Sequence, residues 1–220
     1  ADKIIITGAG YNDGLFYPET RPAADPVQLV YAGKLSFAKG VPWLLRALQS
    51  VRTPLWQLHL IGGGSGEEKE TCLELAQALG PKVQVHGAVT QTDLAAIMRQ
   101  AHILVLPSFY EGLPLVLLEG LASGCRIVAT DLPGAKELFG DVDTDMITLV
   151  KTPRLHRLDQ PYEEDEAAFE KELQRALERQ IKAAFRNPQI DLSLVRPLLN
   201  AYTWAGVFKK VNETYRACLP

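Results

Sequence analysis

The stretch ILVLPSFYEGLPLVLLEGLASGCRIVA, residues 103–129, decides the fold class of this 220-residue chain. It opens with the wholly apolar run Ile103–Leu106 and ends with a second strand-like run, Arg126–Ala129. Between them, residues 114–123 have the composition of a helix, with proline in the first turn and glycine just past the end. Apolar strands without alternation are buried on both faces, and a strand–helix–strand unit joins parallel strands. The stretch therefore predicts part of a parallel sheet covered by helices.

The same alternation continues on both sides of this stretch. Short apolar runs predict further strands at Val27–Ala32, Trp56–Ile61, Lys82–His86 and Met146–Val150. Segments with apolar residues at helical spacing lie between them, at Val41–Val51, Glu67–Leu79 and Thr92–Gln100. We therefore predict an α/β fold with a Rossmann-like, doubly wound parallel sheet from residue 27 to residue 150.

The two ends of the chain differ from this middle part. The first 26 residues begin with the strand-like IIIT and continue with GAGYNDGLFYPETRPAADP, which is rich in Gly, Pro and Asp and is typical of a linker. A polar stretch then follows Lys151 and leads into a predicted helix at Glu163–Phe185, which Asn187-Pro188 ends. A last helix is predicted at Trp204–Leu219. The predicted organisation is a linker over residues 1–26, an α/β domain over 27–187 and a C-terminal helical segment over 188–220.

Composition argues against several classes of protein. The net charge is −3 and there is no run of Lys and Arg, so nucleic acid is not an expected partner. No uninterrupted apolar stretch reaches the ~18 residues of a membrane span, and the first residues lack the pattern of a signal peptide. Three widely spaced cysteines fit reduced thiols, and the four histidines lack the spacing of zinc ligands. We expect a cytoplasmic protein without a metal or other cofactor, associated with the inner membrane surface only peripherally if at all.

The loops after the strands are the candidate sites, because ligands of an open parallel sheet bind at the carboxyl ends of its strands. The first loop, GKLSFAKG at residues 33–40, places Lys34 and Lys39 at the start of a helix, where two ammonium groups and the helix dipole favour a diphosphate. The second, GGGSG at residues 62–66, allows backbone amides to approach a ligand closely. It matches neither the dinucleotide fingerprint nor the phosphate-loop pattern. Solvated lysines and an ordinary Gly-rich turn are the alternative interpretations.

The third loop, which follows the strand at residues 103–106, introduces two glutamates eight positions apart. Glu111 lies in the loop, and Glu119 lies within the apolar helix LVLLEGLA. A carboxylate in such a helix is costly unless it is hydrogen-bonded, so Glu119 is not expected to be an ordinary surface residue. Paired hydroxyl groups, such as those of a ribose or a sugar, are natural partners for it.

These loops resemble the donor site of glycosyltransferase family 4, a family of retaining enzymes with the two-domain GT-B fold. The spacing Glu-x7-Glu within PSFYEGLPLVLLEGLASG, followed by RIVATDLPGAKEL, is similar to the family's signature. YAGKLSFAKGVPWLLRAL resembles its phosphate loop, LHLIGGGSGEEKE its Gly-rich turn, KVQVHGAV the strand whose backbone contacts the base, and TDLPGAKEL a loop on the donor side. GAGYNDGLFYP resembles the interdomain linker, and YTWAGVFKKVNETYRACL the final helix, which crosses back toward the other domain.

The resemblance implies a role for each matching position. The catalytic candidates are Lys34 and Lys39, which would contact the donor diphosphate, and Glu111, which would face the donor sugar or its reacting centre. Glu119 would hold the ribose hydroxyls. The other expected binding residues are Gly33, Gly62, Gly63, Gly64, Val85, His86, Gly112, Leu113, Pro114 and Leu115. The first lysine position is often Arg in the family. Leu113-Pro114 replaces the more usual Phe-Gly, and the proline has no N–H to offer a ligand.

The expected function is donor binding in a retaining transferase that takes its sugar from a nucleotide-diphosphate-sugar, with UDP as the expected nucleotide. Lysines and a helix dipole would stabilise the departing diphosphate without a metal. The resemblance also implies an N-terminal acceptor-binding domain outside these 220 residues, so the chain alone would not complete the transfer. Two alternatives remain: a nucleotide-sugar-binding module that does not catalyse, and a sugar-phosphate epimerase or synthase of GT-B architecture. The sequence is compatible with uridine, guanosine or adenosine as the base.

Overall fold

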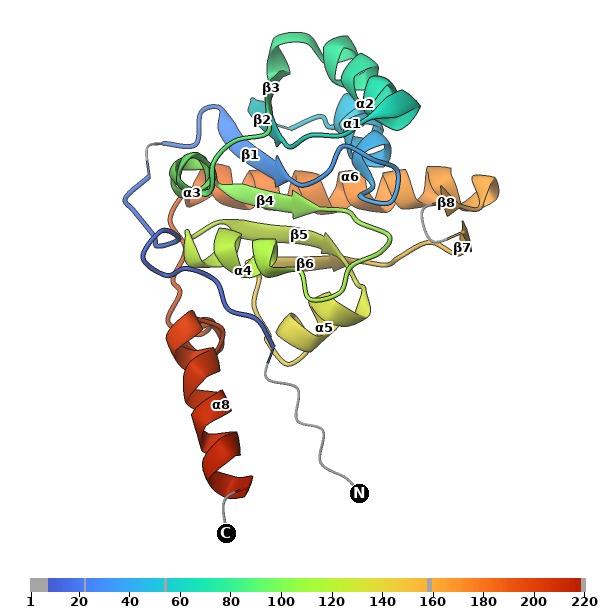
Figure 1. Ribbon diagram of the computed structural model, residues 1–220. Helices are drawn as coiled ribbons and strands as arrows, with labels where there is room; N and C mark the ends of the chain where they lie inside the picture. Colours follow the sequence, from blue (N-terminus) through green and yellow to red (C-terminus); the bar gives the residue numbers. More distant parts are fainter. Residues whose placement is uncertain (1–7, 22, 54, 158–159, 219–220) are drawn as a thin grey trace.

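Six parallel strands form the central sheet of the protein (Figure 1). They are β1 (Val27–Ala32), β2 (Trp56–Ile61), β3 (Val83–Gly87), β4 (Ile103–Leu106), β5 (Arg126–Thr130) and β6 (Ile147–Val150), in the spatial order β3-β2-β1-β4-β5-β6. This computed structural model describes residues 8–21, 23–53, 55–157 and 160–218. The predicted parallel sheet is confirmed, and each predicted strand within it ends or begins within one residue of the observed bounds. The strand-like IIIT lies outside the described residues.

Helices cover both faces of the sheet. The six that follow its strands are α1 (Val41–Ser50), α2 (Gly66–Ala78), α3 (Gln91–Gln100), α4 (Leu115–Ala122), α5 (Pro133–Phe139) and α6 (Glu163–Arg186). Helix α6 runs behind the sheet across β1, β4, β5 and β6 and packs against α1, which in turn packs against α2 (Figure 1). Helices α3 and α4 cover the opposite face over β1, β4 and β5. This arrangement is the doubly wound α/β layer predicted from the alternating pattern.

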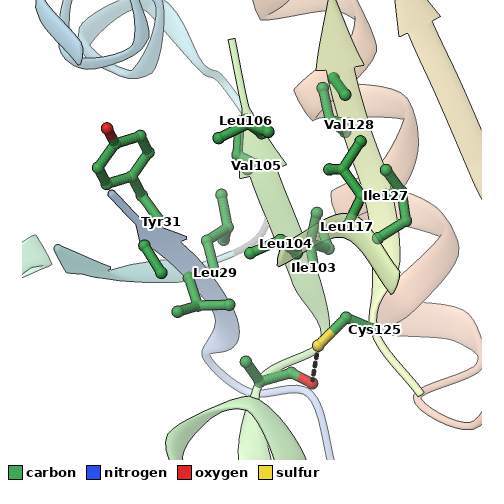
Figure 2. Close-up of a cluster of buried hydrophobic side chains, with 14 of the residues drawn as sticks. Leu29, Tyr31, Ile103, Leu104, Val105, Leu106, Leu117, Cys125, Ile127 and Val128 are labelled. Atoms are coloured by element: carbon green, nitrogen blue, oxygen red, sulfur yellow. Dashed lines mark hydrogen bonds between the residues drawn. The ribbon is translucent and has the colours of Figure 1, made fainter. Parts of the chain in front are cut away.

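The core lies between the sheet and these helices (Figure 2). Leu29, Ile103 and Ile127 come from three adjacent strands and are fully buried, as is Leu117 of α4. Cys125 lies at the edge of this cluster, where its thiol donates to the carbonyl oxygens of Met98 (3.3 Å) and Ala101 (3.4 Å). Within the described part of the chain, Cys72 and Cys125 are both buried free thiols.

The strand order reverses direction between β1 and β4, the two central neighbours. The chain leaves β1 toward the face that carries α1, and it leaves β4 toward the face that carries α4. Ligands of open α/β sheets usually bind at the carboxyl ends of the strands beside such a switch point. The fold thus brings together the loops at residues 33–40 and 107–114.

The segment before β1, expected to be a linker, packs onto the domain. Phe16 is 1% exposed, and the Tyr11 amide donates to the carbonyl oxygen of Tyr202 at 2.9 Å. Arg21 is buried, and its guanidinium donates to the carbonyl oxygens of Ser123 and Gly124 just past the end of α4. A cation at this position matches the negative end of the helix dipole. The segment is therefore anchored by buried contacts despite its Gly- and Pro-rich composition.

The C-terminal part adds elements that the sequence pattern did not predict. These are the antiparallel pair β7 (Leu155–Arg157) and β8 (Gln160–Pro161) and the short helix α7 (Arg196–Ala201). Helix α5 occupies most of the segment TDLPGAKEL, which the sequence predicts to be a loop. The predicted last helix is present as α8 (Trp204–Cys218), which contacts α7 and projects away from the sheet (Figure 1). Within the described residues, no helix has the length and apolar character needed to span a bilayer.

Candidate functional site

The loops after β1, β2 and β3 are joined by backbone hydrogen bonds at the carboxyl edge of the sheet. The bonds run from Gly33 N–H to Ile61 O (3.0 Å), from Leu35 N–H to Gly63 O (2.7 Å) and from Gly62 N–H to Gly87 O (2.8 Å). Gly62 has a φ of 141°, and a Cβ at this position would collide with the carbonyl oxygen of Gly33. Only glycine fits there. The expected close backbone approach therefore exists between the loops themselves.

Lys39 and Glu111 meet at the carboxyl ends of the neighbouring strands β1 and β4. The Lys39 Nζ lies 2.8 Å from the Glu111 Oε1, and their side chains are 28% and 15% exposed. Two backbone features set this distance. The Phe109 amide donates to the Ala38 carbonyl oxygen at 2.8 Å, and Gly40, with a φ of 67°, caps α1 in the left-handed conformation. The structure thus brings two predicted catalytic residues, from loops about 70 residues apart, into direct contact.

Glu111 is oriented by hydrogen bonds from side chains that the sequence pattern did not indicate. The Ser108 hydroxyl donates to the same Glu111 Oε1 at 2.7 Å, and Ser108 is fully buried. The Thr130 hydroxyl, at the end of β5, donates in turn to the Ser108 carbonyl oxygen. Only their positions in the sequence could have indicated them: Ser108 precedes Glu111 by three residues, and Thr130 ends the strand next to β4. These contacts orient Glu111 so that its Oε2 has no hydrogen-bond partner among the described residues.

Lys34, the other predicted diphosphate contact, has an exposed side chain. Its backbone is fixed, because the Tyr31 hydroxyl donates to the Lys34 carbonyl oxygen at 2.7 Å. Burial raises the pKa of Tyr31 well above its ordinary value, and the nearby Cys72 and Glu111 raise this pKa further. Tyr31 therefore stays a neutral donor that holds the start of the loop. The Lys34 side chain is thus exposed, whereas that of Lys39 is partly buried.

The start of α4 follows Glu111 closely along the chain. The Leu115 amide donates to the Leu113 carbonyl oxygen at 2.9 Å, so one of the amides expected to meet ligand oxygens is already occupied. Pro114 is the N-cap residue and has no N–H, as expected. A Cβ on Gly134, in the first turn of α5, would collide with the Gly112 carbonyl oxygen. Close packing of α5 therefore shapes this loop from outside.

Glu119 lies on α4 and is half-buried. Burial raises the pKa of its carboxyl above the ordinary value, and a hydrogen bond from the Gln91 side chain opposes that shift to a smaller extent. Gln91 is the first residue of α3, which begins just after the carboxyl end of β3. Glu119 is therefore positioned at the same edge of the sheet as the other candidate residues, with a carboxylate that gains stability from any further hydrogen-bond donor.

Val85 and His86 belong to β3, the edge strand, so part of their backbone faces away from the sheet. The Val85 side chain is 45% exposed. The His86 Nε2 lies 2.9 Å from the Nδ1 of His59, whose Nε2 lies 2.9 Å from the Gln28 Oε1. Burial, followed by the effect of His86, lowers the pKa of His59. Sequence reasoning missed this pair, although both histidines hold the fourth position of adjacent strands.

The site combines a cation, two carboxylates and a helix start at the switch point of a doubly wound sheet. Among the described residues, no group of three or more His, Cys, Asp or Glu side chains is arranged to hold a metal ion. These features define the class: doubly wound α/β domains whose candidate residues lie at the carboxyl edge of the sheet, where open parallel sheets bind their ligands. Within that class, the chain belongs to the glycosyl transferases group 1 family, whose model matches residues 26–178.

Relatives with known names agree with this membership. An uncharacterized glycosyltransferase of Haemophilus influenzae is 37% identical over 113 residues, which cover 50% of this chain and 31% of that protein. The glycogen synthase of Mycobacterium tuberculosis is 31% identical over 119 residues, covering 53% of this chain and 29% of that enzyme. The chain thus spans about a third of the length of these relatives.

Solved structures show the same fold. The Anabaena HepE protein in complex with UDP and glucose superposes with a TM-score of 0.69 at 18% sequence identity, over 94% of this chain and 55% of that one. The predicted resemblance to a GT-B glycosyltransferase domain is confirmed by the family match and by these relatives together.

Proposed function

We propose that this chain is the donor-binding domain of a retaining glycosyltransferase that takes its sugar from a nucleoside diphosphate sugar, with UDP as the nucleotide. The observation that carries the proposal is the contact between Lys39 and Glu111 at the switch point, with Glu119 at the same edge of the sheet. Family membership supports the reaction type. The similar fold of HepE, which was solved with UDP and glucose, supports the choice of ligand.

Each residue has a chemical task in this proposal. Lys39 and the exposed Lys34 neutralise the diphosphate, each as a point charge on a flexible stem. Glu111 accepts hydrogen bonds from the donor sugar, and Glu119 accepts them from the ribose diol. The amides of Gly112 and Leu113, together with the Gly-rich loop at residues 62–66, approach phosphate and nucleoside through the backbone. The free edge of β3 at residues 85–86 receives the base.

The transfer step breaks the bond between the anomeric carbon and the diphosphate and forms a bond from that carbon to the oxygen of an acceptor hydroxyl, whose proton passes to the departing phosphate. Negative charge accumulates on the departing phosphate oxygen as its bond breaks. In this proposal Lys39, just before the N-cap of α1, contacts the departing phosphate, and its charge and the positive end of the helix dipole stabilise the negative charge. We propose that an N-terminal acceptor-binding domain of the whole protein completes the cleft, and that the protein works in the cytoplasm.

Calorimetric titration of the purified chain with UDP, GDP and ADP tests the donor assignment. We expect UDP to bind with a measurable Kd and GDP and ADP to bind at least about tenfold more weakly, a difference of about 1.4 kcal/mol. Preferred binding of GDP or ADP would overturn the choice of base. Absence of binding to all three nucleotides would contradict the proposed function itself.

A further inference from the structure

The Lys39–Glu111 contact puts an internal anion, the Glu111 carboxylate, at the position that we propose for the phosphate ligand. Lys39 has one charged partner among the described residues, the Glu111 carboxylate at 2.8 Å, and the nearby Tyr110 carbonyl oxygen lies at 3.5 Å. A diphosphate that approaches Lys39 therefore meets an ammonium group that the Glu111 carboxylate already neutralises. We propose that Glu111 competes with the donor diphosphate for Lys39, and that diphosphate binding releases Glu111 toward the sugar. This inference rests on the proposed function.

The ion pair is not needed to hold the two loops together. The Phe109 amide already donates to the Ala38 carbonyl oxygen at 2.8 Å, and the Phe109 ring packs against the Trp43 ring with centroids 4.8 Å apart. Phe109 is 2% exposed and Trp43 is 4% exposed, so these contacts are buried, whereas Lys39 and Glu111 are partly solvated. A partly solvated ion pair adds little stability. Its consequence is therefore expected in ligand binding rather than in folding.

The two partners differ in how firmly they are held. Glu111 Oε1 keeps the hydrogen bond from the buried Ser108 hydroxyl when Lys39 moves away. Lys39 has a flexible stem and three N–H donors, so it can turn from a carboxylate to a phosphate oxygen. When Lys39 moves from Glu111 to the phosphate, Glu111 stays charged and oriented by Ser108, and it can accept hydrogen bonds from sugar hydroxyls. Nucleotide and sugar recognition are thereby coupled through a single lysine.

The competition predicts a gain of affinity on removing a site residue. Glu111→Gln should tighten UDP binding about three- to tenfold, since Lys39 no longer has to leave a charged partner. Simple repulsion between Glu111 and the diphosphate would also produce a gain, and a double-mutant cycle separates the two explanations. Repulsion acts whether or not Lys39 is present, whereas competition acts only through Lys39.

The cycle consists of the wild-type chain, Lys39→Ala, Glu111→Gln and the double variant, each titrated with UDP and with UDP-glucose by calorimetry. Lys39→Ala should weaken UDP binding about tenfold or more. The double variant should match Lys39→Ala within about twofold, so that the gain from Glu111→Gln disappears. In Glu111→Gln alone, the additional affinity of UDP-glucose over UDP should fall, because the sugar loses its acceptor. If another nucleotide is preferred, the same cycle is run with that nucleotide and its sugar.

Glu172→Gln is the matched control. Glu172 lies on α6, is exposed and pairs with Arg175, so its replacement should leave UDP affinity unchanged. Equal thermal unfolding of Glu111→Gln and wild type checks that the variant is folded. Unchanged or weaker UDP binding by Glu111→Gln, or an undiminished gain in the Lys39→Ala background, would overturn the competition while wild-type UDP binding upholds the proposed function. Loss of all nucleotide binding in the wild type would overturn both.

Discussion

At the scale of single residues, Glu119 shows how a proposed binding group affects stability. Burial raises the pKa of its carboxyl in the folded chain. A raised folded-state pKa means that the group favours folding when it is protonated and loses that contribution as the pH rises through the folded-state pKa. At neutral pH the charged Glu119 is therefore a destabilising residue, and the Gln91 hydrogen bond offsets only part of this cost. We propose that the ribose diol supplies the missing donors.

Glu119→Gln should accordingly separate stability from binding. The variant is expected to have an equal or higher melting temperature than the wild type at pH 7. The difference should shrink as the pH falls through the folded-state pKa and vanish only below about 3, where the wild-type carboxyl is protonated in both states. UDP affinity at pH 7 should fall because the amide is a weaker acceptor for the diol. Thermal unfolding across pH and calorimetry with UDP measure the two effects, and a destabilised variant with unchanged UDP affinity would contradict this role.

Gly62 illustrates a backbone requirement at the same edge of the sheet. Its φ of 141° and the position of the Gly33 carbonyl oxygen leave no room for a Cβ, whereas a Cβ on Gly63 would meet no atom within 4 Å. Gly62→Ala should lower the free energy of unfolding by about 2–4 kcal/mol, and Gly63→Ala should change it by less than about 1 kcal/mol. Urea denaturation of both variants gives the comparison. Equal destabilisation of the two would show that the strain at Gly62 is relieved by a local shift.

At the scale of an element, α8 presents an apolar stripe with two different environments. Trp204, Val207, Phe208, Val211 and Tyr215 recur at helical spacing along α8. Val207 is 5% exposed and faces the domain, whereas Trp204 and Phe208 are 46% and 59% exposed, with ring centroids 5.9 Å apart. Packing on the chain's own core therefore accounts for part of the stripe only. We propose that a further domain of the whole protein covers the exposed part.

The same helix offers a matched test of this description. Val207→Ala should lower the free energy of unfolding by about 1–2 kcal/mol, because it removes buried methyl groups. Phe208→Ala should change it by less than about 0.5 kcal/mol, although it removes a much larger side chain, since that side chain is already in water. Urea unfolding followed by circular dichroism distinguishes the two variants. A larger loss for Phe208→Ala would mean that the exposed face packs on something within the chain or on a second copy.

At the scale of the whole molecule, the proposed division of labour concerns more than these residues. The chain spans 55% of the HepE chain to which it is similar, and 31% of the Haemophilus influenzae relative. The proposed donor site opens at the carboxyl edge of the sheet, where the described residues provide one wall. A transfer reaction also needs an acceptor held within bonding distance of the anomeric carbon. We therefore assign this task to the proposed N-terminal domain.

Residues 1–220 are accordingly expected to bind the nucleotide without transferring sugar. Incubation with UDP-glucose and a mixture of sugar, polysaccharide and lipid acceptors, followed by mass spectrometry, should reveal no glycosylated product above the no-protein control. The full-length protein, prepared in parallel, is the positive control. Efficient transfer by the 220-residue chain would show that the acceptor site lies within it and would contradict the two-domain proposal.

The order of the strands and helices was readable from the sequence because burial leaves a local signature. Apolar runs such as Ile103–Leu106 have no polar alternation, and the helices between the strands show a 3.6-residue period. Glu119 was also identifiable, since a carboxylate in an apolar helix is costly in any fold. Helix α5 escaped detection because seven residues containing Pro133 and Gly134 at the start carry too short a pattern.

Proximity across the sheet was decided only by the tertiary structure. Nothing local in the sequence indicates that Lys39 lies 2.8 Å from Glu111, that Thr130 supports Ser108, or that His59 contacts His86. Each pair joins residues from different loops or strands, so its distance depends on strand order and register. The Lys39–Glu111 distance depends also on the backbone hydrogen bond between Phe109 and Ala38. The sequence by itself determined which residues are candidates for the chemistry. Because contacts between distant segments form only when the whole sheet is assembled, the tertiary structure determined which of those residues act on one another.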